Sequence, residues 1–208
     1  MKDNVYKQFE SVLGPENITR DPCTLDAYTY QWTAESSGDT TRLLPHRAEC
    51  VTLPSSTEEV QAIVKLCNRH NLKFKAHSTG WGAFGAANAE GVVLLDLRRM
   101  NRLVEINEKD MYAVVEPYVI WGQLQTVAMK KGLNCATIGA GAGTSPLASC
   151  TSVQGLGYNN VSMGYNGRSI LGVEWVLPNG EILRPVSYTH LTLPTTDVVG
   201  CSGGGGGG

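Results

Sequence analysis

The sequence has no long apolar run and no surplus of basic residues. No stretch of about eighteen consecutive apolar residues occurs, so nothing in it predicts a membrane span. Its 17 lysine and arginine residues stand against 19 acidic ones, and the net charge of −2 gives no electrostatic footprint for nucleic acid. The N-terminus lacks a basic segment followed by an apolar one, so we expect no signal peptide and a cytoplasmic location.

Cysteine is present, but without the spacing that metal sites or redox pairs need. None of the six cysteines forms a Cys-x-x-C pair, and no Cys/His cluster has metal-ligand spacing. We therefore expect no metal site, and we expect free thiols because disulfides are rare in reducing compartments. Those thiols are Cys23, Cys50, Cys67, Cys135, Cys150 and Cys201.

Charged residues are sparse, at 17%, whereas hydrophobic residues make up 42%. A 208-residue chain of this composition can bury a sizeable core, as one domain or a tight pair of subdomains. Glycine is in excess: six of the 24 glycines end the chain, and most of the others fall within residues 80–91 and 139–167. These two clusters indicate loops with special backbone conformations.

The first half of the sequence shows helix and strand patterns in turn. Apolar residues at helical spacing, Val5, Phe9 and Leu13, predict an N-terminal helix that ends at Gly14. Residues 15–48 show no clear periodicity, so residues 1–45 are expected to form a helix and an irregular arm. Beyond them the order is strand, helix, strand, loop and strand, which is an α/β pattern. The strands are predicted at 49–53, 73–76 and 92–96, and the helix begins at a cap formed by Ser56 or Thr57.

The second half of the sequence predicts another unit. Strands at 103–106 and 112–115 precede a helix over 121–131, which Gly132 ends. Strands at 170–177 and 181–183 are joined by Asn179-Gly180, a strong hairpin signal. The stretch 135–168 reads as one long Gly/Ser/Asn-rich loop, and a loop of that length is usually functional or wrongly assigned.

Both glycine-rich stretches have the composition of an anion-binding loop. In His77–Gly85, small residues let the backbone approach an anion, successive N–H groups can form a concave site, and Ser78 and Thr79 add hydroxyl donors. The loop has neither the Gly-Lys-Ser/Thr of a P-loop nor the helix that follows a dinucleotide fingerprint. A tight structural turn is the alternative interpretation there, and disorder is the alternative for residues 138–167.

Several segments together resemble one family. Residues from about 46 to 185 resemble the FAD-binding domain of the vanillyl-alcohol oxidase and p-cresol methylhydroxylase (PCMH-type) flavoproteins, with the glycolate and D-lactate dehydrogenase branch nearest. The matching segments are 51–60, 76–85, 93–101, 115–117, 153–157 and 172–183. Their order and spacing make the resemblance specific.

The resemblance implies an α+β (α/β) fold of two α/β subdomains, about 46–100 and 101–185, with FAD extended between them and the chain truncated before a C-terminal substrate domain. By resemblance, the pyrophosphate would be held by the loop residues Ser78, Thr79, Gly80, Trp81 and Gly82 with Phe84 and Gly85. The isoalloxazine and ribityl region would be lined by Pro117, Ser152, Val153, Gly155 and Gly157. The segment from Val173 to Val176 would contact the adenine side through its backbone.

The sequence also departs from the family pattern. Trp81 occupies the position at which a histidine of some relatives bonds covalently to the flavin, so we expect non-covalent FAD. His77 replaces the usual arginine, and we expect a packing or surface role for it. Tyr118 replaces a glycine and Gln154 replaces the first glycine of a pair. Tyr165 and Arg168 are expected to serve as hydrogen-bonding residues rather than in chemistry.

The function that the resemblance implies is oxidation of a 2-hydroxy acid or alcohol by hydride transfer to FAD, with electrons passing on to an acceptor. The small-molecule substrate and the catalytic residues would belong to the missing domain, so no catalytic residue is assigned. Two alternatives are a flavin-binding module or subunit without activity of its own, and a nucleotide-binding domain that takes no flavin.

The end of the sequence is expected to be non-native. Residues 186–196 resemble the translation of a transposase-type sequencing adaptor, and the six final glycines resemble read-through of a short fragment. We expect residues 186–208 to be an artefactual tail with no part in the fold.

Overall fold

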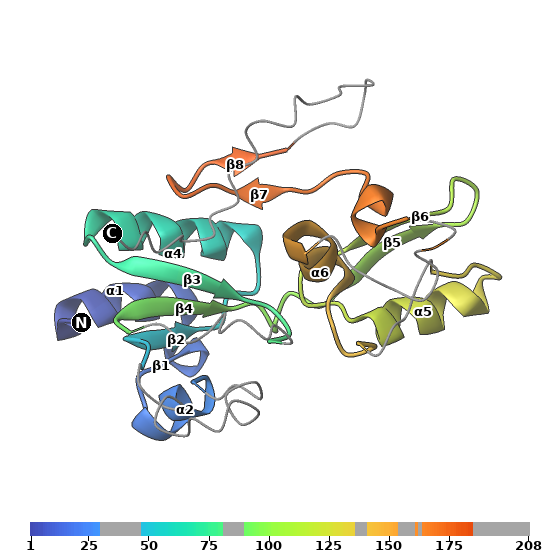
Figure 1. The fold of residues 1–208 in the computed structure, drawn as a ribbon. Helices are drawn as coiled ribbons and strands as arrows, with labels where there is room; N and C mark the ends of the chain where they lie inside the picture. The colour runs from blue at the N-terminus through green and yellow to red at the C-terminus, as the bar shows by residue number, and fades with distance from the viewer. Residues whose placement is uncertain (30–46, 81–89, 136–140, 154–160, 162–163, 185–208) are drawn as a thin grey trace, which may run out of the picture.

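A computed structural model of the chain describes residues 1–29, 47–80, 90–135, 141–153, 161 and 164–184. Its first group of elements surrounds a four-stranded sheet (Figure 1). The strands lie in the order β1 (Ile18–Thr19), β2 (Cys50–Thr52), β4 (Val92–Asp96) and β3 (Lys73–His77). Strands β2, β4 and β3 run parallel, whereas β1 pairs antiparallel with β2 at the edge. The parallel strands confirm the α/β pattern expected from the sequence.

One face of the sheet is covered by α1 (Asp3–Leu13) and α4 (Thr57–Arg69). Phe9 of α1 is completely buried in the core cluster that these helices form with the sheet. Burial of such an apolar stripe is the main source of helix stability in a protein of this kind. The buried members of the cluster are Val5, Phe9, Leu13, Ile18, Cys50, Ile63, Val64, Leu66, Cys67, Val93 and Leu95.

The opposite face is covered by α2 (Pro22–Ala27), whose Leu25 packs on Val51 and Leu94 in a second, smaller core cluster. This helix and β1 lie within the segment that was expected to be irregular, and a short 3₁₀ turn, η1 (Pro15–Asn17), precedes them. For the described residues 15–29 the expectation was wrong, because elements of two to six residues are too short to show a period. Local signals were nevertheless present, since Asp21 caps the helix by accepting a hydrogen bond from the Thr24 backbone N–H at 2.8 Å.

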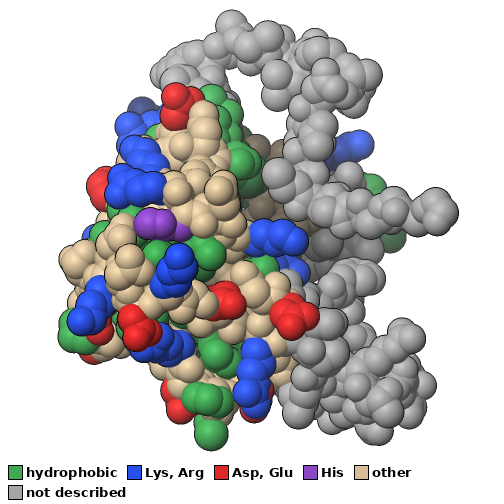
Figure 2. All heavy atoms as spheres, turned by 90° about the vertical axis from the view of Figure 1, so that its left-hand side faces the viewer, with side chains coloured by type: hydrophobic (Ala, Val, Ile, Leu, Met, Phe, Trp, Pro, Cys, Tyr) green, Lys and Arg blue, Asp and Glu red, His purple; other side chains and the backbone are tan. Residues whose placement is uncertain are grey.

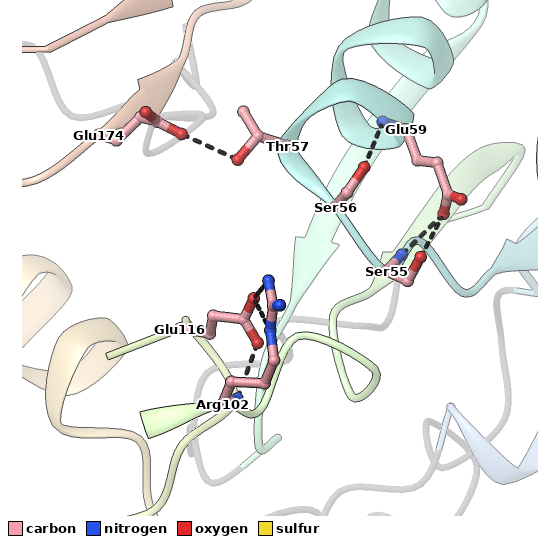
Figure 3. Close-up of polar contacts among 7 residues, drawn as sticks. All are labelled: Ser55, Ser56, Thr57, Glu59, Arg102, Glu116 and Glu174. Atoms are coloured by element: carbon pink, nitrogen blue, oxygen red, sulfur yellow. Dashed lines mark hydrogen bonds and ion pairs between the residues drawn. The ribbon is translucent and has the colours of Figure 1, made fainter. Parts of the chain in front are cut away.

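The start of α4 shows which residue caps this helix. The Glu59 backbone N–H donates to Ser56 Oγ at 3.2 Å, and the Ser55 backbone N–H donates to the Glu59 carboxylate at 2.7 Å (Figure 3). This reciprocal arrangement resembles a capping box and assigns the cap to Ser56 rather than Thr57. At the other end, the helix stops just before Asn71, which has a φ of 52°.

The second group of elements follows along the chain. Strands β5 (Leu103–Asn107) and β6 (Tyr112–Val115) form an antiparallel pair, and α5 (Trp121–Lys130) follows them. Helix α6 (Pro146–Val153) and the 3₁₀ turn η3 (Asn166–Ser169) lie inside the stretch that was expected to be a loop. Figure 1 shows α5, α6 and this strand pair grouped beside the carboxyl ends of β3 and β4.

A last hairpin returns to the first group. Strands β7 (Trp175–Val176) and β8 (Ile182–Leu183) pair antiparallel, so the strand predicted over 170–177 is reduced to two residues. The side chain of Gln61 on α4 donates to the Gly180 carbonyl at 2.6 Å, and Thr57 Oγ1 donates to the Glu174 carboxylate at 2.8 Å (Figure 3). The hairpin therefore lies along α4 rather than beside the elements that precede it in the chain.

The surface formed by the first group carries charges of both signs. Figure 2 shows acidic and basic side chains interspersed on the face that lies at the left of Figure 1. Within the described residues, no helix is both long enough and apolar enough to cross a membrane. The same part of the chain contains no group of three histidine, cysteine or acidic residues placed to hold a metal ion, and its five cysteines are free thiols.

Candidate functional site

The first glycine-rich loop begins where two parallel strands end side by side. His77, the last residue of β3, is the register partner of Asp96, the last residue of β4. The Leu97 backbone N–H donates to the His77 carbonyl at 2.9 Å, so the chain leaving β4 is fixed to the end of β3. In α/β sheets, ligands bind outside the carboxyl ends of the strands, and the loop from Ser78 starts at that edge.

Two hydroxyl groups connect this loop to the second group of elements. Ser78 Oγ donates to the Pro117 carbonyl at 2.7 Å, and the Ser145 backbone N–H donates to Thr79 Oγ1 at 3.2 Å. Segments 39 and 66 residues apart in sequence therefore meet at the loop. We expected both hydroxyls to be free donors for an anion; instead, the proton of Ser78 is committed to Pro117. What Ser78 can still offer a ligand is its backbone N–H.

Gly80 is the third described residue of the loop, and its position admits no side chain. Its φ is +68°, a conformation that favours glycine, and a Cβ added there would lie 2.8 Å from His77 Cε1. The imidazole ring therefore lies directly against the loop backbone. A glycine at this point lets the loop backbone pass the ring closely.

Helix α6 begins next to the loop. Ser145 is almost fully buried and caps the helix, since the Ala148 backbone N–H donates to Ser145 Oγ at 3.2 Å. The Trp121 backbone N–H donates to the Thr144 carbonyl at 2.9 Å, which ties the start of α5 to the same turn. Sequence reasoning missed α6, although a serine cap followed by Pro146 at the first helical position is a recognised start signal.

A buried carboxylate lies beside the loop. Asp96 has no exposed surface, and its Oδ2 accepts hydrogen bonds from the Tyr28 hydroxyl at 2.6 Å and from Arg98 Nε at 2.8 Å. The Arg98 guanidinium also donates to the Tyr28 hydroxyl oxygen at 2.7 Å, which closes a triangle of three groups. Burial and the bond to Asp96 raise the pKa of Tyr28, so the hydroxyl keeps its proton. A buried charge requires pairing of this kind.

His77 lies between this cluster and the loop. Its ring meets the Tyr28 ring edge to face, with centroids 5.5 Å apart. Its Nδ1 is shielded from solvent, and no described residue forms a hydrogen bond with it. Burial lowers the pKa of His77, the nearby Arg98 adds to that effect, and Asp96 opposes it, so the ring is neutral at pH 7. The packing role expected for this histidine agrees with these contacts.

Pro117 is held from its own side by a charge pair. The Glu116 carboxylate, largely buried, accepts hydrogen bonds from the Arg102 backbone N–H at 2.7 Å and from its guanidinium at 2.7 and 2.9 Å (Figure 3). Burial raises the pKa of Glu116, but the bonds from Arg102 outweigh that effect and hold it below its usual value. The turn that presents the Pro117 carbonyl to Ser78 is therefore fixed at its base.

The structure brings together part of the predicted site. Ser78, Thr79, Gly80 and Pro117 lie at one place, with Ser145 as an addition that sequence reasoning did not supply. Ser152 and Val153 belong to the last turn of α6, at the end opposite Ser145. Val173 and Val176 lie on the segment beside α4, and the side chain of Val176 packs against the larger core cluster. Trp81, Gly82, Phe84, Gly85, Gly155 and Gly157 lie outside the described residues.

The fold and this loop define a class of protein. A parallel sheet whose strand ends carry a glycine-rich loop, connected there to a second group of elements, is the arrangement of an α/β domain that binds a nucleotide-type cofactor. The family model described as the FAD binding domain matches residues 48–185, more than half of the chain. The chain belongs to this FAD-binding family, as the sequence pattern indicated.

The relatives of the chain carry the names of enzymes of different kinds. The chain is 30% identical over 180 residues to a D-2-hydroxyglutarate dehydrogenase of Stutzerimonas stutzeri and 32% identical over 183 residues to a probable mitochondrial D-lactate dehydrogenase of Danio rerio. These matches cover 85% and 88% of this chain but 37% and 35% of those proteins. A solved structure of p-cresol methylhydroxylase with substrate bound is 28% identical and gives a TM-score of 0.75 over 87% of this chain and 34% of the other.

These matches confirm the fold class, and the chain spans about a third of the length of the relatives. The described residues also fit an FAD molecule on independent grounds. The Gly80 backbone lies so close to His77 that no other residue type fits there, and the solvent-shielded Nδ1 of His77 lacks a partner among the described residues. Small residues and backbone N–H groups at a strand end are the donor set that a pyrophosphate needs.

Proposed function

We propose that the chain is the FAD-binding portion of a flavin-dependent oxidoreductase that oxidises a 2-hydroxy acid or an alcohol. The observation that carries the proposal is the match of residues 48–185 to the FAD binding domain family, with the loop at Ser78–Gly80 attached to the second group of elements. The substrate class rests on the relatives that are named as dehydrogenases of D-2-hydroxyglutarate and D-lactate.

The chain's own residues have binding and orienting roles in this proposal. The backbone of Ser78, Thr79 and Gly80 would hold the pyrophosphate, together with Trp81, Gly82, Phe84 and Gly85. Pro117, Ser152, Val153, Gly155 and Gly157 would line the isoalloxazine and ribityl region, and Val173 and Val176 the adenine side. FAD, when bound, supplies the acceptor for the hydride that leaves the hydroxyl-bearing carbon of the substrate.

The first experiment is an absorbance spectrum. The purified chain is incubated with FAD, free cofactor is removed by gel filtration, and the flavin bands are recorded against a serum albumin control. Retained flavin with shifted bands supports the proposal; a folded chain that retains none contradicts it. Precipitation with acid then tests the mode of attachment, because non-covalent FAD, expected from Trp81, passes into the supernatant.

A second candidate function is a flavin-binding subunit without activity of its own. The observation that favours it is the length of the match, since the chain spans about a third of each relative. Turnover separates the two candidates when it is measured on the full-length parent protein, which would include the substrate domain expected after residue 185: the FAD-loaded parent is mixed with D-lactate, D-2-hydroxyglutarate, glycolate or p-cresol and an artificial electron acceptor. Reduction of the acceptor supports an oxidoreductase, and FAD binding without reduction favours the subunit. The oxidoreductase proposal also includes transfer of electrons from FAD to a natural acceptor, and a cytoplasmic location.

A further inference from the structure

The segment before the family domain contributes to the site. Tyr28 follows α2 and precedes residue 48, where the match to the FAD binding domain family begins. Its hydroxyl donates to Asp96 at 2.6 Å and accepts from Arg98 at 2.7 Å, and its ring meets that of His77. The side chain of Tyr28 therefore contacts Asp96 at the end of β4, His77 at the end of β3, and Arg98, which follows β4.

The contacts of Tyr28 pass to the glycine loop through His77. The ring of His77 lies between Tyr28 and Gly80, and the Gly80 backbone is so close that a single added carbon would be 2.8 Å from Cε1. A shift or rotation of the ring would therefore displace the loop backbone. The loop itself, at Ser78 and Thr79, is joined to Pro117 and to the cap of α6.

Among the described residues, the ring of His77 is positioned by packing, with Tyr28 on one side and the Gly80 backbone on the other. Its Nδ1 has no hydrogen-bond partner among the described residues, so its orientation depends on packing against Tyr28 and on the neighbouring charges. Tyr28 is in turn fixed by two short hydrogen bonds to a completely buried carboxylate and its guanidinium partner. Hydrogen bonds to charged groups are stronger than those between neutral groups, which makes the phenol a firm anchor.

We infer that Tyr28 is a positioning residue for FAD: through Asp96, Arg98 and His77 it sets the conformation of the loop at Ser78–Gly80 that receives the cofactor pyrophosphate. This inference rests on the proposed function, because it concerns the same site. It adds that the cofactor site depends on the N-terminal segment outside the family domain, through a hydroxyl group that is bonded to Asp96 and Arg98.

The test removes one oxygen atom. The Tyr28→Phe variant keeps the ring against His77 and loses both hydrogen bonds, and Tyr6→Phe is its matched control, since the half-buried Tyr6 hydroxyl donates only to the Ile18 carbonyl, at 3.3 Å. FAD affinity is measured by quenching of flavin fluorescence, at a temperature where circular dichroism shows each protein folded. We expect Tyr28→Phe to weaken binding about tenfold, the effect of about 1.4 kcal/mol, and Tyr6→Phe to change it less than twofold.

A second readout reports on positioning rather than on stability. In proton–carbon NMR spectra of the apo chain, the Cε1–H signal of His77 gives its titration midpoint, which we expect to be below that of an ordinary histidine. Loss of the Tyr28 hydroxyl leaves the Asp96 charge less compensated, so the midpoint should rise in Tyr28→Phe and stay constant in Tyr6→Phe. A variant that only loosened the fold would lower the unfolding midpoint without moving this signal selectively.

A second pair of variants covers the case in which Tyr28→Phe fails to fold. Arg98→Met removes the guanidinium that bonds to the Tyr28 hydroxyl, and its neighbour Arg99→Met removes an equal charge whose bond goes to the Leu53 carbonyl. We expect weaker FAD binding only for Arg98→Met. If the wild-type chain binds FAD and both Tyr28→Phe and Arg98→Met bind it equally well, the inference is wrong; if the wild-type chain binds none, the proposed function itself fails.

Discussion

Substitution of Gly80 by alanine tests the contact between the loop and His77 most directly. Two costs are expected. The φ of +68° places an alanine in the left-handed region, which costs about 1–2 kcal/mol. In addition, the new Cβ would lie 2.8 Å from His77 Cε1, and the ring cannot retreat freely because Tyr28 packs against it. Overpacking of this kind costs about 1–3 kcal/mol, so the sum is about 2–5 kcal/mol in the free energy of unfolding.

Gly91→Ala is a matched control, because Gly91 has a φ of +69° and nothing within 4 Å of an added Cβ. It should show the conformational cost alone, about 1–2 kcal/mol. Urea unfolding of both variants gives the difference, which we expect to be about 1–3 kcal/mol and to disappear when Gly80→Ala is made in a His77→Ala background. FAD affinity should fall at least tenfold in Gly80→Ala and hardly at all in Gly91→Ala. Equal unfolding costs for the two glycines would refute the contact with His77.

Two further predictions concern parts of the fold that support the site. Glu116→Gln should lower the free energy of unfolding by about 1–2 kcal/mol at pH 7. The folded-state pKa of Glu116 is depressed, so this contribution to stability is fully present above the ordinary pKa of a glutamate, about 4.3, and is lost as the pH falls through the folded-state pKa. Urea unfolding at pH 7 and at pH 3 should therefore show the difference between Glu116→Gln and wild type shrinking at the lower pH. A constant difference would contradict the ion pair. Phe9→Ala, in the core between α1 and the sheet, should cost about 3–5 kcal/mol in thermal or urea unfolding, whereas Met129→Ala, at a side chain that is 64% exposed, should change it by less than about 0.5 kcal/mol. Similar losses in both variants would mean that Phe9 is not a core residue.

Helices and strands long enough to show a periodic or continuous apolar pattern were predictable from the sequence. Helices α1, α4 and α5 each have an apolar stripe and a glycine or asparagine near the end, and the central strands β2 and β4 of the parallel sheet are short, mainly apolar runs. Short elements were not predictable in this way. Helix α2 has only six residues, too few turns for a periodic apolar pattern. Helix α6 has eight residues, most of them small, so its sequence resembles that of a loop. In both cases the capping residues were the available signal.

The site was predictable only where local composition determines it. The glycine loop stood out because of its small residues, and Pro117 came from the family pattern. The cluster of Tyr28, Asp96 and Arg98 could not be found, because its members lie 68 and 70 residues apart and their types are ordinary for an exposed loop. Their role follows from the parallel pairing of β3 with β4, which places His77 opposite Asp96, and a single sequence does not specify that register.

The two-residue strand β1 affects how readily this domain aggregates. It pairs antiparallel with β2 and occupies the hydrogen-bonding edge that β2 would otherwise present. A bare edge of a parallel sheet is a template on which another chain can add a strand, and such addition leads to aggregation. The family domain begins at residue 48, so a piece cut at that boundary would lack β1 and expose β2. The unit in which this edge of β2 is covered is thus larger than the unit defined by family resemblance, and a domain exchanged between proteins needs its preceding strand to travel with it.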